Sequence, residues 1–312
     1  MNNHDESKNS QNVKRILVIK HGAFGDIIQA NGILKNIRLH HQGAKITLLT
    51  TQNFFSLMET CPYIDNIIID NRAPLLNFWR QVTLFRKLYQ QRFSLIYDLQ
   101  NSSRTFIYRK FFLFFARWIS TKCKHHPISG LRGLVEMLAA NNISTQDALK
   151  PDISWLANDV SKLLKKEGVA GKYVVLIPGS SLNHPEKRWP YYNELAKLFM
   201  KDGIQVVTIL GPDERELKKS SSGTLLSNLT WADLAGVIKS SVFIIGNDTG
   251  PIHVASCLGK PGVAIFGPTT SGLRSELKRR HFDVIKVEVL SELSATQMHE
   301  KILNNKAYKM AS

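Results

Sequence analysis

The chain has 312 residues, a formal net charge of +16 and a hydrophobic content of 43%. This length exceeds that of a typical single domain, so we expect two domains, each with its own core. No apolar run approaches the roughly 18 residues of a membrane-spanning helix, and residues 1–13 lack the apolar stretch of a secretory signal. Cys61, Cys123 and Cys257 have no metal-binding or redox spacing and are expected to be free thiols in a reducing cytosol.

The N-terminal half alternates predicted strands with predicted helices. A buried-strand pattern over 15–20 precedes a glycine-containing loop at 21–26, and apolar residues then recur at helical spacing to Ile37. Further strands are expected at 45–50, 64–70 and 95–99, with a short helix near 54–60 and a longer amphipathic helix over about 75–91. Alternation at this pace predicts a parallel sheet covered on both faces.

The alternation stops at Lys150–Trp155, the candidate start of a linker, and then resumes. Strands are predicted at 173–177, 205–210, 242–245, 263–266 and 282–287, and helices at 191–202, 231–239, 251–258 and about 292–303. We therefore expect a disordered tail (1–13), an N-terminal Rossmann-like domain (14–155), a C-terminal Rossmann-like domain (156–290) and a final helix and tail (291–312). The predicted fold class is α/β, with two parallel sheets facing a central cleft.

The positive charge is concentrated between Leu75 and Arg132, where Asp98 is the only acid. The cations of this stretch are Arg80, Arg86, Lys87, Arg92, Arg104, Arg109, Lys110, Arg117, Lys122, Lys124 and Arg132. A nucleic acid, an anionic membrane and an anionic glycolipid would each satisfy such a patch. Composition does not choose among these partners.

The loop Gly22–Asp26 supplies the first candidate catalytic residue. Its glycines, Gly22 and Gly25, lack the spacing of the dinucleotide-binding motif, and no Lys-Ser or Lys-Thr pair follows them as in a P-loop. An NAD enzyme or an ATPase is therefore disfavoured. In a structural interpretation, Asp26 is a helix N-cap and Gln29 completes a capping box. In a functional one, Asp26 is a general base held by a tight glycine turn.

Hydroxyl and basic side chains gather after the first strand of the C-terminal half. Pro178–Ser181 ends that strand with Ser180 and Ser181, and Lys187 stands in the segment Glu186–Pro190 that precedes the next helix. Hydroxyls, amides and cations together suit a cluster of anionic oxygens. A solvated basic loop beside the core is the alternative.

The segment Gly246–His253 is the most specific pattern. It places a strand end, a turn rich in capping residues and a helix N-terminus together, so free amides and the positive end of the helix dipole suit a diphosphate. Capping by Asp248 or Thr249 is compatible with this role. His253 alone is more often a packed, hydrogen-bonded histidine.

The loop Gly211–Glu214 follows the second strand of the C-terminal half. In this topology the carboxylate of Glu214 can accept hydrogen bonds from the hydroxyls of a ribose. A helix start at Glu214 is an equally good interpretation of the sequence.

These motifs, in this order, resemble glycosyltransferase family 9, the heptosyltransferases of lipopolysaccharide inner-core synthesis. The resemblance extends from about Lys14 to Thr270. It is carried by Lys20–Asp26, by Pro178–Ser181 with Lys187–Pro190, and by Gly246–His253 followed by Phe266–Thr269.

The resemblance implies a GT-B fold, inversion at the anomeric carbon, and a donor diphosphate bound by the C-terminal domain without an essential metal or another cofactor. It implies that Asp26 is the general base and that Lys187 binds phosphate. The other implied donor-binding residues are Ser180, Ser181, Glu214, Asp248, Thr249, Gly250 and His253.

The resemblance further implies transfer of heptose from ADP-heptose to a lipopolysaccharide inner core or a related anionic glycolipid. This reaction would take place in the cytoplasm, with peripheral contact to the inner membrane. One alternative is another sugar-nucleotide enzyme of the same fold, such as an epimerase. The other is a basic nucleic-acid-binding protein, for which the sequence offers no recognised motif.

The stretch Arg109–Trp118 combines cations with aromatic residues. With Lys122 and Lys124, its cations are expected to dock the protein electrostatically on an anionic membrane. Two interpretations of the aromatic residues remain open: they insert into the membrane, or Phe111, Phe112 and Phe115 form the core face of a helix.

Overall fold

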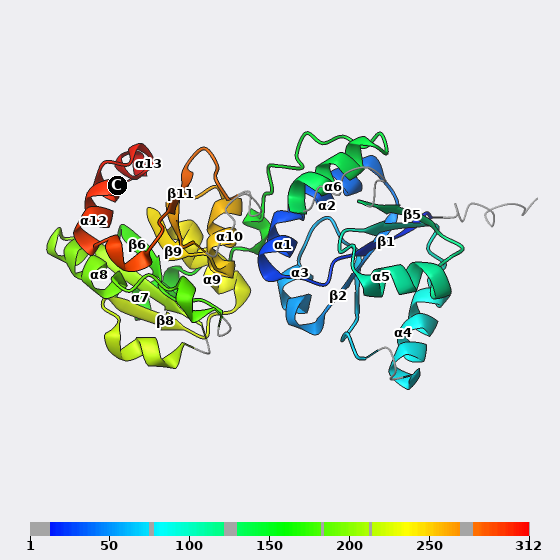
Figure 1. Ribbon diagram of the computed structural model, residues 1–312, viewed down its shortest axis with the longest axis horizontal. Coiled ribbons are helices and arrows are strands. Elements are labelled where there is room, and N and C mark those ends of the chain that lie inside the picture. Colours follow the sequence, from blue (N-terminus) through cyan, green and yellow to red (C-terminus); the bar gives the residue numbers. More distant parts are fainter. Residues whose placement is uncertain are drawn as a thin grey trace, which may run out of the picture. The chain divides into compact units, whose positions relative to one another are not determined.

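The computed structural model describes residues 13–74, 78–121, 130–181, 184–211, 214–268 and 277–311. The chain forms two compact units (Figure 1), the first comprising the described residues of Met1–Gly22 and Ile33–Asp147, the second those of Ala23–Gly32 and Ala148–Ser312. The short segment Ala23–Gly32 thus packs with the C-terminal unit although it lies early in the sequence. Within the described ranges, no helix is both long and apolar enough to cross a bilayer.

The first unit is built on a parallel sheet in the order β3-β2-β1-β4-β5. Ile16–Ile19 of the central strand β1 are completely buried, as expected for a parallel strand with both faces covered. The order of the strands reverses beside β1, and the chain leaves its carboxyl end through His21 and Gly22. The strands are β1 (Arg15–Ile19), β2 (Lys45–Thr50), β3 (Asn66–Ile69), β4 (Leu95–Asp98) and β5 (Arg117–Ser120).

The helices of the first unit pack their apolar sides on this sheet. The core joins Leu17 and Ile19 of β1 to Leu84 and Leu88 of α4 and to Tyr108. The helical elements are α2 (Asn31–His40, which begins in the second unit), η1 (Gln52–Phe54), α3 (Phe55–Met58), α4 (Phe78–Gln90), α5 (Ser103–Ile107), the π-helix η2 (Tyr108–Phe112) and α6 (Gly130–Ala139).

The second unit contains a parallel sheet in the order β11-β10-β9-β6-β7-β8. Strands β6 and β9 are neighbours, and Ile177 at the end of β6 lies opposite Gly246 near the end of β9. Two of the predicted motifs therefore meet at one edge of the sheet. The strands are β6 (Tyr173–Ile177), β7 (Gln205–Leu210), β8 (Thr224–Ser227), β9 (Phe243–Asn247), β10 (Gly262–Phe266) and β11 (Phe282–Lys286).

Apolar side chains of α8 and α12 close the core of the second unit around Trp189. The indole of Trp189 is 2% exposed, and its Nε1 donates a hydrogen bond to the carbonyl of Leu293. The helical elements are α1 (Phe24–Gln29), η3 (Ser154–Leu156), α7 (Ser161–Lys166), η4 (Pro185–Lys187), α8 (Tyr192–Lys201), η5 (Arg215–Ser220), α9 (Trp231–Ser240), α10 (Gly250–Cys257), η6 (Leu290–Glu292), α12 (Ala295–Leu303) and α13 (Lys306–Ala311).

The predicted α/β class with two parallel sheets is confirmed. The long helix predicted from Leu75 is described from Phe78, and the short helix predicted near 54–60 is divided between η1 and α3. Strands β5 and β8 were not predicted, because each is short and only partly buried. Cys61 and Cys257 are buried and form no disulfide, whereas Cys123 lies outside the described residues.

Candidate functional site

The buried side chain of Asn247 joins the loops that follow β6 and β9. Its Nδ2 donates to the carbonyl oxygens of Pro178, at 2.8 Å, and Gly179, at 3.1 Å. Its Oδ1 accepts from the backbone N–H of Trp189 and from the hydroxyl of Tyr192, each at 3.1 Å. One amide thus fixes both motifs and the segment that carries Lys187. Sequence reasoning assigned no role to Asn247, although its position at the end of a predicted strand was the available signal.

Lys187 and Asp248 form an ion pair above these strand ends. Lys187 Nζ donates to Asp248 Oδ2 over 2.8 Å, and the two side chains are 21% and 16% exposed. The other carboxylate oxygen of Asp248 lies 3.9 Å from Nε2 of His253. Residues predicted from two separate motifs are therefore brought together around one carboxylate, and the ammonium group of Lys187 is partly open to an anionic ligand.

Helix α1 packs directly on α10, and two glycines make this close approach possible. A Cβ atom at Gly25 would lie 2.7 Å from the ring of His253, and one at Gly250 would lie 2.6 Å from the ring of Phe24. Both distances are shorter than a carbon–carbon contact permits. The ring of Phe24 also packs against Trp231 of α9, with centroids 4.3 Å apart.

A buried glutamine orients His253 within this contact. Gln29 is 4% exposed, and its Nε2 lies 2.9 Å from Nδ1 of His253. An amide nitrogen can only donate, so Nδ1 accepts and the proton of the neutral imidazole resides on Nε2, the nitrogen that faces Asp248. Burial lowers the pKa of His253, although the carboxylates of Asp248 and Asp26 act in the opposite direction. Gln29 was not foreseen as part of the site.

Asp26 does not occupy the helix position expected from the sequence. Helix α1 begins at Phe24, and Ala23 is its N-cap, so Asp26 is the third residue of the helix. Its Oδ2 accepts from the backbone N–H of Ala23 at 3.3 Å. The predicted capping box with Gln29 is therefore wrong, because the helix begins earlier and Gln29 bonds to His253 instead. The carboxylate of Asp26 is exposed.

Thr249 occupies the N-cap position of α10, but its hydroxyl makes no capping hydrogen bond. Asp248 is not the N-cap residue either, because it precedes Thr249, and its Oδ2 is engaged by Lys187. The side-chain capping considered for these two residues is absent. The helix begins at Gly250, and its positive end lies next in sequence to the Lys187–Asp248 pair.

Glu214 turns back toward the loop that follows β6. Its Oε2 accepts from the backbone N–H of Gly211 at 2.7 Å, and a Cβ atom at Gly179 would overlap with its carboxylate. Burial raises the pKa of Glu214, although the Gly211 amide and the charge of Arg188 oppose this shift. Glu214 is the N-cap residue of the 3₁₀ helix η5, so the interpretation of this position as a helix start is confirmed. The structure also places the carboxylate beside the loop that carries Ser180.

The two serines of this loop have different surroundings. Ser180 is buried, donates to the carbonyl of His184 over 2.9 Å and accepts from Nε of Arg188 at 3.1 Å. Ser181 is exposed. Arg188 also bonds to Glu216 over 2.9 Å. Ser180 thus shapes the loop, and Ser181 presents its hydroxyl to solvent.

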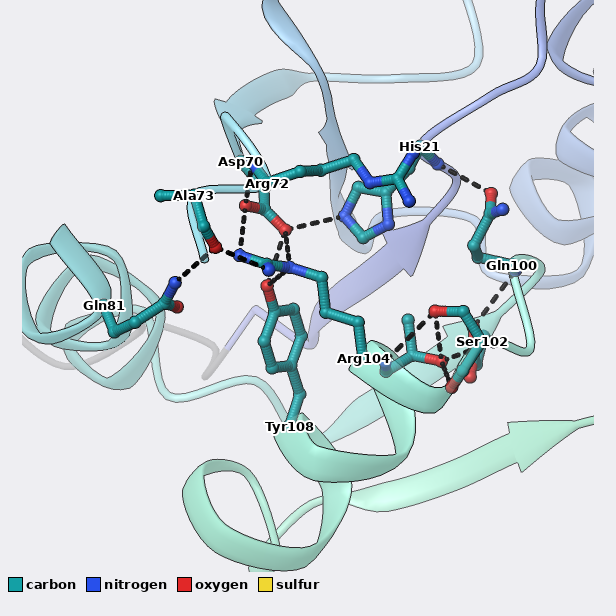
Figure 2. Close-up of polar contacts among 11 residues, drawn as sticks. His21, Asp70, Arg72, Ala73, Gln81, Gln100, Ser102, Arg104 and Tyr108 are labelled. Atoms are coloured by element: carbon teal, nitrogen blue, oxygen red, sulfur yellow. Dashed lines mark hydrogen bonds and ion pairs between the residues drawn. The ribbon is translucent and has the colours of Figure 1, made fainter. Parts of the chain in front are cut away.

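A second polar cluster lies in the first unit, next to Gly22. Figure 2 shows His21, Arg104 and Tyr108 converging on the buried carboxylate of Asp70. Asp70 Oδ2 lies 3.0 Å from His21 Nε2, 3.1 Å from Arg104 Nε and 2.6 Å from the Tyr108 hydroxyl. Burial alone would raise the pKa of Asp70, but these hydrogen bonds outweigh it and hold the pKa well below its usual range.

This cluster fixes the residue at which the glycine loop starts. His21 also donates its backbone N–H to Gln100 over 2.9 Å (Figure 2). Gly22 follows with a φ of +137°, and a Cβ atom there would lie 2.9 Å from the ring of Phe54. Only glycine fits this position without strain. No sequence motif marked Asp70 or Arg104, because they are far apart in the chain.

In the part of the chain that the structure describes, no three His, Cys, Asp or Glu side chains are grouped so as to bind a metal ion. The donor set of the site is instead an ammonium group, hydroxyls, an imidazole N–H and the amides at the start of α10. These groups suit phosphate oxygens.

The comparisons by sequence and by structure agree on the kind of protein that this chain resembles. A family model described as glycosyltransferase family 9 (heptosyltransferase) matches residues 109–302. The lipopolysaccharide core heptosyltransferase OpsX of Haemophilus influenzae is 21% identical over 283 residues, which are 81% of this chain and 79% of that protein. A family 9 glycosyltransferase structure from Veillonella parvula has a TM-score of 0.80 at 19% identity, covering 95% of this chain and 97% of its own. For Escherichia coli heptosyltransferase WaaC with ADP-2-deoxy-2-fluoro heptose, the TM-score is 0.72 at 18% identity, with 93% and 99% covered.

The Gln29→Glu substitution is expected to move the proton of His253. A carboxylate at this position accepts from Nδ1–H, so the imidazole would carry its proton on Nδ1 and turn an acceptor toward Asp248. Nitrogen-15 NMR of histidine-labelled protein measures the tautomer, with the His253→Gln variant as the assignment control. An unchanged tautomer in the Glu variant would show that Gln29 does not set it.

The Asp70→Asn substitution is expected to lower the free energy of unfolding at pH 7 by about 2 to 3 kcal/mol, since it weakens charged hydrogen bonds to Arg104. Because the pKa of Asp70 is lowered on folding, its stabilising effect is complete above the unfolded-state pKa of about 4 and declines below it. The difference between the proteins should therefore shrink toward about pH 3.

Urea unfolding measured at both pH values tests this expectation. Asp65→Asn is the matched control, because Asp65 pairs with Arg38 but its side chain is 42% exposed. We expect its effect to be about 1 kcal/mol or less. Equal unfolding free energies for Asp70→Asn and the unsubstituted protein would contradict the role given to the cluster.

Proposed function

Since the chain belongs to glycosyltransferase family 9 and is therefore a glycosyltransferase, we propose that it transfers heptose from ADP-heptose to a lipopolysaccharide inner core or a related anionic glycolipid. The name of the Haemophilus relative supports the acceptor class. The ligand of the Escherichia coli structure supports the donor. Family membership does not support the alternatives of an epimerase or a nucleic-acid-binding protein.

The observation that carries the proposal is the convergence of Lys187, Asp248 and His253 at the start of α10. In the proposed complex, the donor diphosphate lies against Lys187, the Ser181 hydroxyl and the amides of Thr249 and Gly250. The carboxylate of Glu214 then accepts hydrogen bonds from the ribose. Glu214 is half-buried beside the Ser180 loop, and its carboxylate oxygens are suited to accept hydrogen bonds from the ribose hydroxyls.

In the proposed reaction, Asp26 removes a proton from the acceptor hydroxyl as this oxygen attacks the anomeric carbon. The bond from that carbon to the diphosphate breaks in the same displacement, through a transition state with oxocarbenium character. The configuration is inverted, and ADP leaves with an added negative charge. In this proposal, Lys187, the Nε2–H of His253 and the helix amides stabilise that charge.

The neutral state of His253 fits this role. Burial lowers its pKa, so the imidazole is a neutral donor of one proton through Nε2. Its neighbour Asp248 keeps Lys187 in position while remaining short of a direct hydrogen bond to His253, at 3.9 Å. A phosphate oxygen entering between them would receive donors from both sides.

The direct test is a donor screen with ADP-heptose and with UDP- and GDP-sugars, measured as nucleoside diphosphate release in the presence of lipopolysaccharide-core acceptors. We expect acceptor-dependent ADP release from ADP-heptose, with an inverted anomeric product by proton NMR. Release from a UDP- or GDP-sugar alone would refute the donor assignment. Release that ignores the acceptor would refute transfer.

The Asp26→Asn substitution is expected to reduce turnover by about 10² to 10⁴-fold while leaving ADP affinity within about two-fold. Asn retains an oxygen that can accept from the N–H of Ala23, so the start of α1 is preserved. Single-turnover rates and calorimetric ADP binding measure the two effects separately. Near-normal turnover would show that Asp26 is not the base.

The Lys187→Ala substitution is expected to weaken ADP binding by about 10- to 100-fold, because a charged hydrogen bond to phosphate is lost. Lys187→Arg should restore part of the affinity. Lys197→Ala is the matched control, since Lys197 is an exposed lysine of α8 in the same unit. Equal ADP affinity in the two Ala variants would place the diphosphate elsewhere.

The proposed acceptor also has consequences for location. A phosphorylated glycolipid is held in a bilayer, whereas ADP-heptose is a dissolved nucleotide sugar. We therefore propose that the reaction takes place in the cytoplasm at the inner-membrane surface, with peripheral contact between the membrane and the cations of the first unit. Exposed Arg86, Lys87 and Arg109 support such contact, while Lys122 and Lys124 lie outside the described residues.

A further inference from the structure

Four exposed aromatic side chains gather in the first unit, and we name them the aromatic surface: Tyr89, Phe111, Phe114 and Phe115. They are 64%, 59%, 72% and 46% exposed, respectively. The ring of Phe115 contacts those of Tyr89, at a centroid distance of 5.6 Å, and Phe114, at 6.0 Å. Large aromatic residues clustered on a surface mark a site of interaction.

A π-helix explains why these side chains face outward. The backbone N–H of Leu113 bonds to the carbonyl of Tyr108 over 2.9 Å, which is the wide turn of a π-helix. The extra residue in this turn changes which side chains point inward. Phe112 stacks on Phe85 of α4, with centroids 3.4 Å apart, and Leu113 is buried. The adjacent Phe111 lies outside.

Phe111, Phe112 and Phe115 do not form one core face, because Phe111 and Phe115 are exposed. Regular helical spacing would have placed these residues on one side, but the π-helix and the turn that follows it break that spacing. Phe112 alone joins the core as a partly buried residue. It also anchors the surface, because it ties the π-helix to α4.

Cations lie close to the aromatic surface in the sequence, and exposed acids are absent from the described residues 78–121. Lys110 Nζ lies 5.3 Å from the ring centroid of Phe111. The other exposed cations nearby in sequence are Arg86, Lys87, Arg92, Arg109 and Arg117. The single acid of this range, Asp98, is 5% exposed and lies at the end of β4. The charge thus complements an anionic partner.

We propose that the aromatic surface inserts into the interface of an anionic lipid bilayer, with these cations bound to lipid phosphates. Phenylalanine contributes apolar area without a polar group to desolvate, and cations at its border match the headgroup region. This inference rests on the proposed function, because a glycolipid acceptor would present the enzyme with such a bilayer.

The arrangement of the aromatic rings favours a lipid bilayer over a nucleic acid as the anionic partner. Base stacking by a nucleic acid would use the ring faces, yet Phe115 meets its two neighbours nearly edge-on, at interplanar angles of 86° and 78°. Tyr89, Phe114 and Phe115 thus form an edge-on cluster of rings, without parallel slots for bases. Such a cluster fits the disordered acyl boundary of a membrane.

The salt dependence of vesicle binding distinguishes insertion of the aromatic side chains from electrostatic attraction alone. Co-sedimentation of the full chain with phosphatidylcholine vesicles, with and without phosphatidylglycerol, is measured at about 50 and about 500 mM salt. We expect binding to anionic vesicles that weakens at high salt but persists. The Phe111→Ser/Phe114→Ser double variant should bind roughly 10-fold or more weakly at both salt concentrations. Arg109→Gln/Lys110→Gln should lose affinity mainly at low salt.

Two controls keep the result interpretable. Met200→Ser removes an exposed apolar side chain, 48% exposed, from α8 of the second unit and should not alter vesicle binding. ADP affinity of each variant reports on folding. Insertion would be overturned if the protein did not bind anionic vesicles at low salt. It would also be overturned if the Phe double variant bound as well as the unsubstituted protein, or if a single-stranded RNA of moderate length displaced the protein from the vesicles.

The vesicles contain no lipopolysaccharide, so this result does not depend on the identity of the acceptor. Transfer of heptose to a soluble core fragment, with no vesicle binding, would refute insertion and leave the proposed function intact. Vesicle binding without any transfer of heptose would support insertion and refute the proposed function.

Discussion

The packing of α1 against α10 is the contact on which the rest of the site depends. It requires glycine on both sides, because a Cβ atom at Gly25 would collide with His253 and one at Gly250 with Phe24. The same contact buries Gln29 against His253, so one short helix places the Asp26 carboxylate and orients the imidazole. Any side chain at either glycine would push the helices apart, and the geometry of Asp26 and His253 would be lost together.

The loops that follow the parallel strands of the second unit supply the other polar groups of the candidate site. Neighbouring parallel strands end at the same edge, so the loops after β6 and β9 meet, and Asn247 joins them with hydrogen bonds to Pro178 and Gly179. Lys187 is then held by Asp248 at 2.8 Å. Contacts within the second unit thus hold the positively charged and N–H-bearing groups in place, and preorganised groups of this kind would stabilise the leaving diphosphate of the proposed reaction.

Much of the fold could be predicted because buried parallel strands have a strong sequence signal: continuous apolar runs such as Ile16–Ile19. Strands β5 and β8 lack such runs and were missed. Among the candidate site residues, the motifs singled out Lys187, Asp248 and His253, which lie together in the structure, but not the residues that position them. Gln29 was interpreted as a capping residue, because sequence spacing cannot show that its partner lies on α10. Asp70 was not predicted for the same reason, because its partner Tyr108 is distant in the sequence. The π-helix at Tyr108–Phe112 interrupts the regular helical spacing on which the interpretation of the phenylalanines depended.

If the described loops of the second unit bind a nucleoside diphosphate, ADP will protect their amides, and hydrogen–deuterium exchange of the intact protein with and without ADP measures this protection. We expect slower exchange at the amides of Pro178–Ser181, Pro185–Arg188 and Gly246–His253, where the proposed phosphate ligands lie. Exchange in β1 and β2 of the first unit should be unchanged. Saturation with ADP that leaves Gly246–His253 unprotected would contradict the account, because the amides at the start of α10 would then take no part in binding.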